Sequence, residues 1–433
     1  MSRVIELFYE ITAVARCSKT HSPFIEYMKD FASRTGYECH VDSVNNILCK
    51  KTNSRTDLCL QGHYDIVCLV DNTIPEIVEE DGFLKAKNST LGADNGIACA
   101  YMLKYMEDGQ DLEYLFTSDE EIGLIGANGI EFDLQSSFML NIDSEDEGDI
   151  CIGCAGGVDI FARHDKKKIM QNNKNLDLYE ISLNKLPGGH SGVDIHNETP
   201  NAIKLLAKSI KECEGVLLDI NAGERINSIP ANAKAIIATQ NEPAKTHESM
   251  IITKVDAQSE HLNIYSNQIV NFLYTFANGV RGYDNELKVV LNSINLAIVK
   301  TGIDDIKIEL SARSMDNDEL KRLKLETVAL LECFGFEVHT SGKYPAWKPQ
   351  HNEFAASVLK TYKKHVSTAS LEAIHAGLEC AIFKEKFPDI KVASIGPNIY
   401  NPHSYNERVE ISSIHKLEGV IDDIVKEFGQ KES

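Results

Sequence analysis

The 433-residue sequence lacks long hydrophobic runs. No run reaches the ~20 consecutive apolar residues that a membrane-spanning helix needs, so a membrane is not an expected partner. The start, MSRVIELFYEITAVARCSKT, lacks the layout of a signal peptide, and we expect a cytoplasmic protein. The hydrophobic fraction of 43% and the charged fraction of 25% are typical of an ordinary globular protein.

Basic residues are in the minority. The 44 lysines and arginines face 65 aspartates and glutamates, which leaves a net charge of -21. Nucleic acids and anionic membranes are bound through basic patches, so neither is an expected partner. The acidic excess is compatible with carboxylates that bind metal, although most acidic residues of such a chain are surface charges.

The sequence also lacks a repeated cysteine motif. Its 11 cysteines are an odd number and are scattered singly, which favours reduced thiols. Cys151 and Cys154 form the only CxxC. Because no second pair accompanies them, we interpret both as strand and turn residues and not as a structural zinc site.

Short apolar segments alternate with helical patterns in the first third of the chain. The first 36 residues have apolar side chains near helical spacing. Helical patterns recur in GADNGIACAYMLKYMED and IGLIGANGI, and strand-like segments lie at 39–42, 46–50, 57–61, 112–117 and 138–142. This alternation predicts an α/β fold with a mostly parallel central sheet.

The pattern changes after residue 157. The stretch 163–176 is polar and is expected to form a connection or an exposed hairpin. From 176 to about 342, strand candidates (LDLYEISL, AIIAT, INLAIVK, IKIELSA) recur with amphipathic helices, which predicts an α+β domain. From 344 the first pattern returns, with a helix at 353–365, strands AIFKEKF and VASIG, and a helix at 414–428. We therefore predict one domain from 1–157 and 344–433, and an inserted domain at 158–343.

The segment LCLQGHYDIVCLV, residues 58–70, looks like a buried strand that contains His63 and Asp65. Alternate residues of a strand face the same side, so the imidazole and the carboxylate are expected to converge. Other acidic residues and a histidine follow strands or open a helix: Asp94, Glu120, Glu121, Asp143 and His403. The carboxyl ends of strands in an open α/β sheet border one crevice, and we expect all these side chains to meet there.

Two histidines and several carboxylates in one crevice are typical of hydrolysis assisted by divalent metal ions. Imidazole and carboxylate ligands suit zinc, and two metal ions need a bridging carboxylate with further ligands for each ion. The neighbours Glu120 and Glu121 offer one side chain to metal and one to water as a general base. Asp65 would hold the ring of His63. Each residue alone could have an ordinary structural role, such as a helix cap at Asp94. The combination of all of them favours the metal site.

The motifs GHYD (62–65), LGADNG (91–96), SDEEIG (118–123) and NIDSEDEG (141–148) resemble the successive active-site signatures of the M20 family of metallopeptidases. The resemblance is closest to the aminoacyl-histidine (Xaa-His) dipeptidase branch and covers essentially the whole chain. Further motifs shared with this branch are GCAGG (153–157), LPGGHSGVDIH (186–196), YPAWKP (344–349), IHAGLEC (374–380) and SIGPNIYNPHS (394–404). One departure is Ile66-Val67-Cys68, where the family usually has Val-Pro shortly after its His-x-Asp.

The resemblance implies a role for each residue of the expected metal site. His63 and Asp143 would bind one zinc ion, Glu121 and His403 the other, and Asp94 would bridge the two; manganese or cobalt could replace zinc. Asp65 would orient His63, and Glu120 would be the general base. The family also implies a cis peptide between Asp94 and Asn95, and a catalytic domain with an inserted lid that could serve in homodimer formation.

The resemblance also suggests residues that bind substrate. His190 in PGGHSG would polarise the scissile carbonyl, Asn227 belongs to an Asn-x-Ile-Pro element, and Arg313 would bind the substrate carboxylate. Glu379, with His375 nearby in sequence, is a hypothesis for the free amino group. These roles imply a dipeptidase. The alternatives are a deacylase of N-acyl amino acids from the same family, and a non-catalytic metal-binding protein, against which the retention of Glu120 argues.

Overall fold

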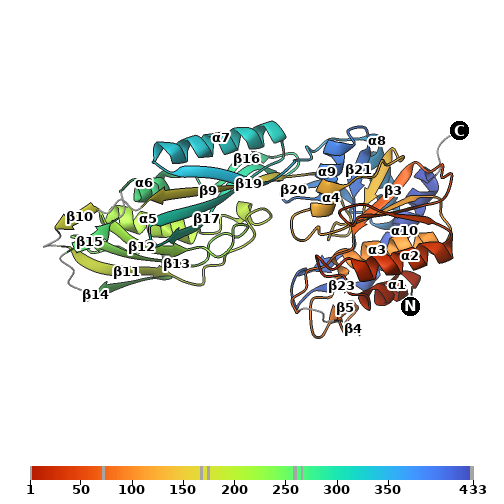
Figure 1. The fold of residues 1–433 in the computed structure, drawn as a ribbon, viewed down its shortest axis with the longest axis horizontal. Coiled ribbons are helices and arrows are strands. Elements are labelled where there is room, and N and C mark those ends of the chain that lie inside the picture. Colours follow the sequence, from red (N-terminus) through yellow and green to blue (C-terminus); the bar gives the residue numbers. More distant parts are fainter. Residues whose placement is uncertain are drawn as a thin grey trace. The chain divides into compact units, whose positions relative to one another are not determined.

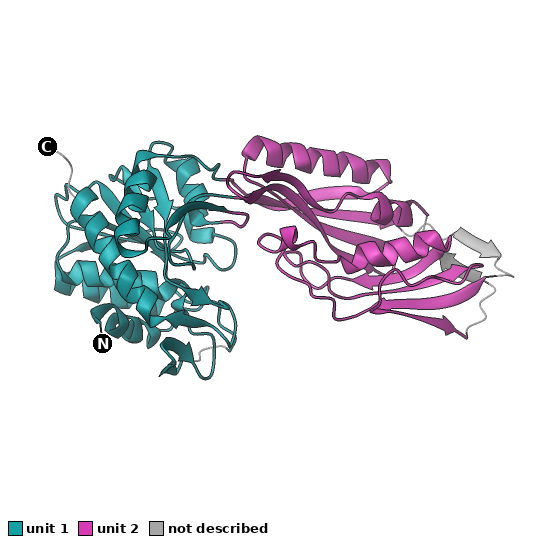
Figure 2. Cartoon of the chain, turned by 180° about the vertical axis from the view of Figure 1, so that it is seen from behind, with its two compact units in different colours: residues 1–154, 347–373, 378–433 teal, residues 155–346, 374–377 magenta. Residues whose placement is uncertain are grey.

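The computed structural model describes residues 2–70, 74–165, 169–172, 176–256, 261–264 and 267–429. The chain divides into two compact units (Figures 1 and 2). Unit 1 comprises Met1–Cys154, Trp347–Ala373 and Leu378–Ser433, and unit 2 comprises Ala155–Ala346 and Ile374–Gly377. None of the described helices combines the length and the apolar composition that crossing a bilayer requires.

Unit 1 contains an eight-stranded sheet with the order β1-β2-β6-β3-β7-β21-β8-β20. The strands are β1 (Glu38–Val41), β2 (Ile47–Lys50), β3 (Leu58–His63), β6 (Glu113–Thr117), β7 (Phe138–Asn141), β8 (Asp149–Cys154), β20 (Ser370–Ile374) and β21 (Lys391–Ser394). The neighbours β6, β3, β7 and β21 run parallel, whereas β1, β2 and β8 pair antiparallel. The predicted parallel arrangement is therefore confined to the middle of the sheet, where these four strands end at one edge.

Helices bury the apolar faces of this sheet. They are α1 (Arg3–Thr12), α2 (Ser22–Thr35), α3 (Ala93–Glu107), α4 (Ile125–Gly129), α8 (Glu353–His365), α9 (Glu379–Lys386) and α10 (Ile411–Phe428). Helix α3 packs on β3 and α1 packs on α3, while α8 packs on β21. Every residue of β3 and β6 is buried, which agrees with the apolar segments LCL and YLF in their sequences. A small four-stranded sheet adds β4 (Ile77–Glu80), β5 (Phe83–Ala86), β22 (Ile399–Tyr400) and β23 (Arg408–Glu410).

The strand predicted at residues 58–70 ends early, at His63. Beyond this residue the backbone exchanges its partners: the N–H of Ile66 donates to the carbonyl of Arg16, and Cys17 forms an isolated bridge with Ile66. Tyr64 and Ile66 are buried, but Leu69 and Val70 are 36% and 42% exposed, so the end of the apolar stretch is not core. The prediction of one continuous buried strand was wrong because residues 16–18 replace the sheet as the pairing partner.

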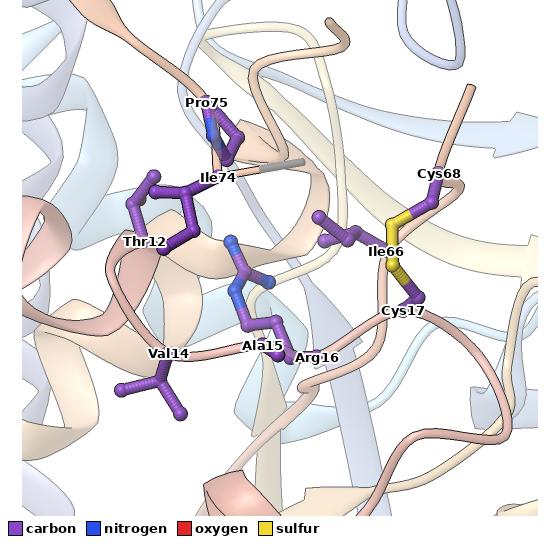
Figure 3. A pocket seen from close by; sticks show the side chains of 9 residues that line it. All are labelled: Thr12, Val14, Ala15, Arg16, Cys17, Ile66, Cys68, Ile74 and Pro75. Atoms are coloured by element: carbon purple, nitrogen blue, oxygen red, sulfur yellow. A yellow bond between two sulfur atoms is a disulfide. The ribbon is translucent and has the colours of Figure 1, made fainter. Parts of the chain in front are cut away.

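The cysteines are not all reduced, contrary to prediction. Cys17 and Cys68 form a disulfide with a sequence separation of 51, and Figure 3 shows it beside Ile66. Cys68 lies in the Ile66-Val67-Cys68 segment that departs from the family pattern, so a cross-link anchors a loop that the family stiffens with proline. Cys151 and Cys154 are buried residues of β8, and neither takes part in the disulfide.

Reduction of this disulfide is expected to destabilise unit 1. In the chain-entropy account, a cross-link that closes a loop of about 50 residues stabilises the folded state by about 4 kcal/mol. Thermal unfolding with and without tris(carboxyethyl)phosphine measures the effect. The Cys17→Ser/Cys68→Ser variant should unfold at the lower temperature whether or not reductant is present, while Cys333→Ser, at an exposed free thiol, should behave like the parent. An unchanged midpoint of the parent after reduction would contradict the prediction.

Two further predictions of secondary structure were wrong. AIFKEKF, expected as a strand, belongs to α9, whose residues from Glu379 to Phe383 are buried on all sides. A short all-buried segment carries no helical periodicity that would distinguish it from a strand. The first 36 residues form two helices, separated at 13–21 by the segment that pairs with Ile66.

Unit 2 is built on an antiparallel sheet. Its strands are β9 (Gly156–Asp165), β11 (Asp177–Leu183), β12 (Val216–Ala222), β13 (Ala233–Thr239), β14 (Met250–Val255), β16 (Gly279–Asp284), β17 (Val289–Thr301), β18 (Asp305–Ser314) and β19 (Glu337–Tyr344). The helices α5 (Ala202–Glu212), α6 (Asn267–Thr275) and α7 (Asn317–Cys333) contribute apolar faces to a core separate from that of unit 1. The predicted strands and helices of this α+β region are present.

Two short strands, β10 (Ile169–Asn172) and β15 (His261–Ile264), pair antiparallel. Of the polar stretch 163–176, residues 166–168 and 173–175 lie outside the described residues. Strand β9 takes in the beginning of this stretch, up to Asp165.

Candidate metal centre

The side chains expected to bind metal come together within unit 1, where the parallel strands end. His63 is the last residue of β3, Asp143 follows β7, and Glu120 and Glu121 follow β6. Asp94 lies in the first turn of α3. The peptide bond between Asp94 and Asn95 is cis, as the sequence resemblance predicted. His403 lies in the loop between β22 and β23.

Asp94 occupies the middle of this group. Its Oδ1 lies 3.2 Å from Nε2 of His63, and its Oδ2 lies 2.9 Å from Nε2 of His403. Each imidazole also faces a second carboxylate: Asp143 Oδ1 lies 3.4 Å from His63 Nε2, and Glu121 Oε2 lies 2.9 Å from His403 Nε2. The carboxylate of Asp94 is thus shared by two His–carboxylate pairs.

Asp65 links His63 to the loop that carries the two glutamates. Its backbone carbonyl lies 3.0 Å from Nδ1 of His63, closer than its carboxylate Oδ1 at 3.6 Å. The carboxylate accepts hydrogen bonds from the backbone N–H groups of Glu120 (3.0 Å) and Glu121 (3.4 Å), and from Ser18 Oγ (2.8 Å). Asp65 therefore fixes the glutamate loop with its side chain and contacts the ring of His63 chiefly through its main chain.

Electrostatics within the group are dominated by burial and by mutual repulsion of the acids. Burial raises the pKa of Glu120 well above its ordinary value. Burial and repulsion from Asp94 raise the pKa of Glu121 to about 7. Burial opposes protonation of His403, but hydrogen bonds to Asp94 and Glu121 raise its pKa to about 11. A bound cation would reduce the repulsion between these acids and would stabilise their ionised forms.

The donor set fits a divalent metal ion. Ligand atoms of His63, Asp94 and Glu121 all lie within 4.8 Å of one another. Glu121 Oε1 is buried and has no hydrogen-bond partner among the described residues, which is unfavourable for a carboxylate oxygen unless a cation pairs with it. Imidazole nitrogen and carboxylate oxygen are ligands that transition-metal ions of this charge accept.

Glu379, at the start of α9, contacts two of the strands that carry this group, β3 and β6. It is fully buried, and its Oε2 accepts hydrogen bonds from Gln61 Nε2 and Thr117 Oγ1, both at 2.6 Å. Burial raises its pKa to about 7, with His63 and Asp143 among the charged groups that act on it. His375, named with Glu379 because of their proximity in sequence, belongs to unit 2.

Within unit 2, three of the residues expected to bind substrate lie near one another. His375 Nε2 lies 2.7 Å from Oγ of Ser293, and Ser293 pairs across the sheet with Arg313. A Cβ at Gly192 would lie 3.0 Å from Cε1 of the His190 ring and 2.5 Å from the carbonyl oxygen of His375, so both residues lie beside Gly192. Burial, followed by the charge of Arg313, lowers the pKa of His190 to about 4 and that of His375 to about 3.

The imidazole of His190 is held as a hydrogen-bond donor. Its Nδ1 accepts from the backbone N–H groups of Gly192 and Val193, both at 3.3 Å, so the proton of the neutral ring lies on Nε2. Arg313 Nη1 donates to the hydroxyl of Tyr344 at 2.8 Å, which leaves other guanidinium donors. Asn227 is exposed, and its backbone carbonyl accepts a hydrogen bond from the N–H of Ser191 at 2.9 Å.

Comparisons with known proteins agree with these features. The profile of peptidase family M20/M25/M40 matches residues 59–427. The cytosol non-specific dipeptidase of Escherichia coli (strain K12) is 30% identical over 474 residues, covering 98% of this chain and 97% of the relative. The crystal structure of aminoacylhistidine dipeptidase from Vibrio alginolyticus matches with a TM-score of 0.83 and 26% identity, over 99% of this chain and 97% of that one.

A more distant structure shares the fold alone. A tripeptidase from Staphylococcus aureus matches with a TM-score of 0.62 and 17% identity, over 99% of this chain and 98% of the other. The profile match extends over more than half of the chain, and the curated relative is 30% identical over 98% of it. The chain belongs to peptidase family M20/M25/M40.

Proposed function

We propose that the protein hydrolyses dipeptides that have a free amino terminus, using a pair of metal ions. The observation that carries the proposal is the position of Asp94 between His63 and His403, each of which has a second carboxylate beside it. This arrangement matches a carboxylate that bridges two metal ions, with one histidine and one further carboxylate for each ion. The family membership and the names of the two similar dipeptidases support the same activity.

We infer that His63 and Asp143 hold one ion, that Glu121 and His403 hold the other, and that Asp94 bridges them. Two zinc ions suit these ligands best, with manganese or cobalt as alternatives. A metal pair held there supplies a water of lowered pKa and polarises the scissile carbonyl.

Glu120 is the proposed general base. Its Oε2 lies 4.0 Å from His63 Nε2, close to the proposed ligands without being part of either pair. In the reaction, Glu120 accepts the proton of the attacking water and returns it to the leaving amine. Asp65 keeps Glu120 in place by accepting the hydrogen bond of its N–H at 3.0 Å.

The residues of unit 2 are proposed to contact the substrate. His190, with its proton on Nε2, donates a hydrogen bond to the scissile carbonyl, and Arg313 binds the substrate carboxylate. His375 and Asn227 complete this group. In this proposal unit 2 acts as a lid, with homodimer formation as a second use. The word cytosol in the relative's name supports a cytoplasmic protein.

Two acids that are not proposed metal ligands, Glu145 and Glu379, support recognition of a free amino group. Glu145 is not one of the proposed ligands, yet burial and the charges of Asp94 and Asp143 raise its pKa to about 8. Glu379 is a second such acid. A substrate ammonium group would relieve their repulsion, whereas an N-acylated substrate carries no charge there.

Hydrolysis of Ala-His beside N-acetyl-Ala-His by the zinc-loaded protein tests the proposal. We expect cleavage of the free dipeptide and at least about a hundredfold lower kcat/KM for the acetylated one, because loss of a buried charge pair costs several kcal/mol. Preference for the acetylated substrate would assign the protein to the deacylases of its family. Absence of turnover with zinc bound would favour a binding protein.

A further inference from the structure

Glu407 lies four positions after His403 and is 2% exposed. Its carboxylate is surrounded by donors from the segment that leads into α3. Oε2 accepts from the hydroxyl of Thr90 and from the N–H of Gly92 at 2.8 Å, and Oε1 accepts from the N–H groups of Ala93 (2.8 Å) and Asp94 (3.2 Å). Glu407 therefore ties the loop of one proposed ligand to the backbone of another.

Arg16 binds a backbone carbonyl of the same segment, that of Gly92. Its Nη2 donates to the carbonyl of Gly92 at 2.7 Å, and its Nη1 donates to the carbonyl of Tyr64 at 3.0 Å, one residue after His63. The side chain is 2% exposed, and Figure 3 shows its guanidinium beside Ile66. Gly92 thus has its N–H bound to a carboxylate and its carbonyl bound to a guanidinium.

The space around Gly92 is closed on the side of Arg16. Its φ is +71°, in the left-handed region, and a Cβ at this position would lie 3.0 Å from Arg16 Nη2 and 3.0 Å from a methyl carbon of Ile66. A Cβ at Gly96, one turn later, would lie 2.4 Å from the same nitrogen. The guanidinium therefore packs against the backbone of the segment on both sides of Asp94.

We propose that Glu407 and Arg16 are positioning residues that clamp Gly92 and thereby hold the Asp94 carboxylate between His63 and His403. The inference rests on the metal centre of the proposed function and assigns no contact between the clamp and substrate. Glu407 sets the distance from the His403 loop to Asp94, and Arg16 sets the distance from the His63 strand end to Gly92. Together they fix both imidazoles relative to one bridging carboxylate.

The charge of Glu407 is needed as well as its shape. A carboxylate accepts on both oxygens and so satisfies all four donors, whereas a glutamine amide turns an NH2 group toward backbone N–H groups that also donate. Repulsion between these donors would displace residues 92–94. Partners that orient metal ligands typically change metal affinity by 10–100-fold when they are replaced.

Titration of the metal-free protein with Co²⁺, followed by the visible absorption of the bound ion, tests the clamp in Glu407→Gln. We expect a 10–100-fold weaker affinity and an altered spectrum, because the ligand geometry changes. Glu410→Gln is the matched control: Glu410 lies three residues further, and its carboxylate binds Asn398 Nδ2 at 2.9 Å and Ser412 but no atom of residues 90–94. This control should bind Co²⁺ like the parent.

A second variant covers the case that Glu407→Gln does not fold. Thr90→Val keeps the shape of the side chain and removes one donor to Glu407, and we expect an affinity about 3–10-fold weaker. Circular dichroism of the metal-free proteins separates positioning from stability. Parent-like Co²⁺ binding by folded Glu407→Gln, or by folded Thr90→Val where the former does not fold, would overturn the proposal. The expected affinities in proteins that cleave no dipeptide would leave the clamp standing and remove the proposed function.

Discussion

Glu120→Gln is expected to abolish dipeptide hydrolysis while the protein still binds metal. General acid–base catalysis contributes about 10²–10⁴-fold, so kcat should fall by at least about a hundredfold, and KM should change little. The amide cannot accept the proton of water at neutral pH, whereas its shape preserves the packing of the loop. Steady-state kinetics and metal content of the purified variant measure the two effects.

Glu121→Gln is the contrasting variant, because the two residues are neighbours and differ in their partners. Glu121 Oε2 lies 2.9 Å from His403 Nε2, while Glu120 makes no contact with that ring among those described. Glu121→Gln should lose metal affinity, and excess metal should restore part of its activity. Excess metal should not restore Glu120→Gln. A Glu120→Gln enzyme with more than about a tenth of the parent activity would refute the assignment of the base.

Removal of metal is expected to lower the stability of the protein and to make that stability fall as pH rises. Without a cation, the pKa of Glu121 is raised to about 7 and that of Glu145 to about 8, first by burial and then by neighbouring acids. An acid whose pKa is higher in the folded state binds more protons when folded, so its ionisation destabilises the fold between its unfolded and folded pKa values.

His403 acts in the same direction as these two acids. Burial opposes protonation of His403, but Asp94 and Glu121 raise its pKa to about 11, so the stabilising charge present below its ordinary pKa is lost as pH rises through the folded value. The metal-free protein should therefore melt at a lower temperature at pH 8.5 than at pH 6. Metal at a thousand times its Kd should add about 4 kcal/mol of stability.

Thermal unfolding across this pH range, with chelator or with zinc, measures both effects. Glu410→Gln again serves as control, since its carboxylate lies outside the group. A metal-free protein whose melting temperature rises between pH 6 and pH 8.5 would contradict the sign of the argument. Equal melting temperatures with and without zinc would show that no metal binds to the folded state preferentially.

The convergence of the strand-end residues could be predicted from the sequence because parallel strands end at one edge of their sheet. His63, Glu120, Glu121 and Asp143 follow three neighbouring parallel strands, so their meeting required no knowledge of distances. The middle strands of unit 1 were predictable from another local pattern: short apolar segments bounded by polar turns are typical of strands buried on both faces.

Other features depend on tertiary structure that no local pattern encodes. The partners of 11 cysteines cannot be deduced from spacing, so the link between Cys17 and Cys68 was missed. Glu407 looks like a charged turn residue in SYNE, and only the donors brought to it by the segment 90–94 give it a role. Arg16, in a stretch taken as helical, is buried because residues 16–18 pair with the chain after His63.

The disulfide has a practical consequence for the purified protein. Ser18, next to Cys17, donates to the Asp65 carboxylate that holds the glutamate loop. The redox state of the disulfide is therefore connected to the position of Glu120, the proposed general base, through Ser18 and Asp65. A dithiol added to the buffer exchanges with the cross-link and also competes for soft metal ions. Two preparations of identical sequence and metal content can therefore differ in turnover, and an assay of free thiols belongs beside every specific activity.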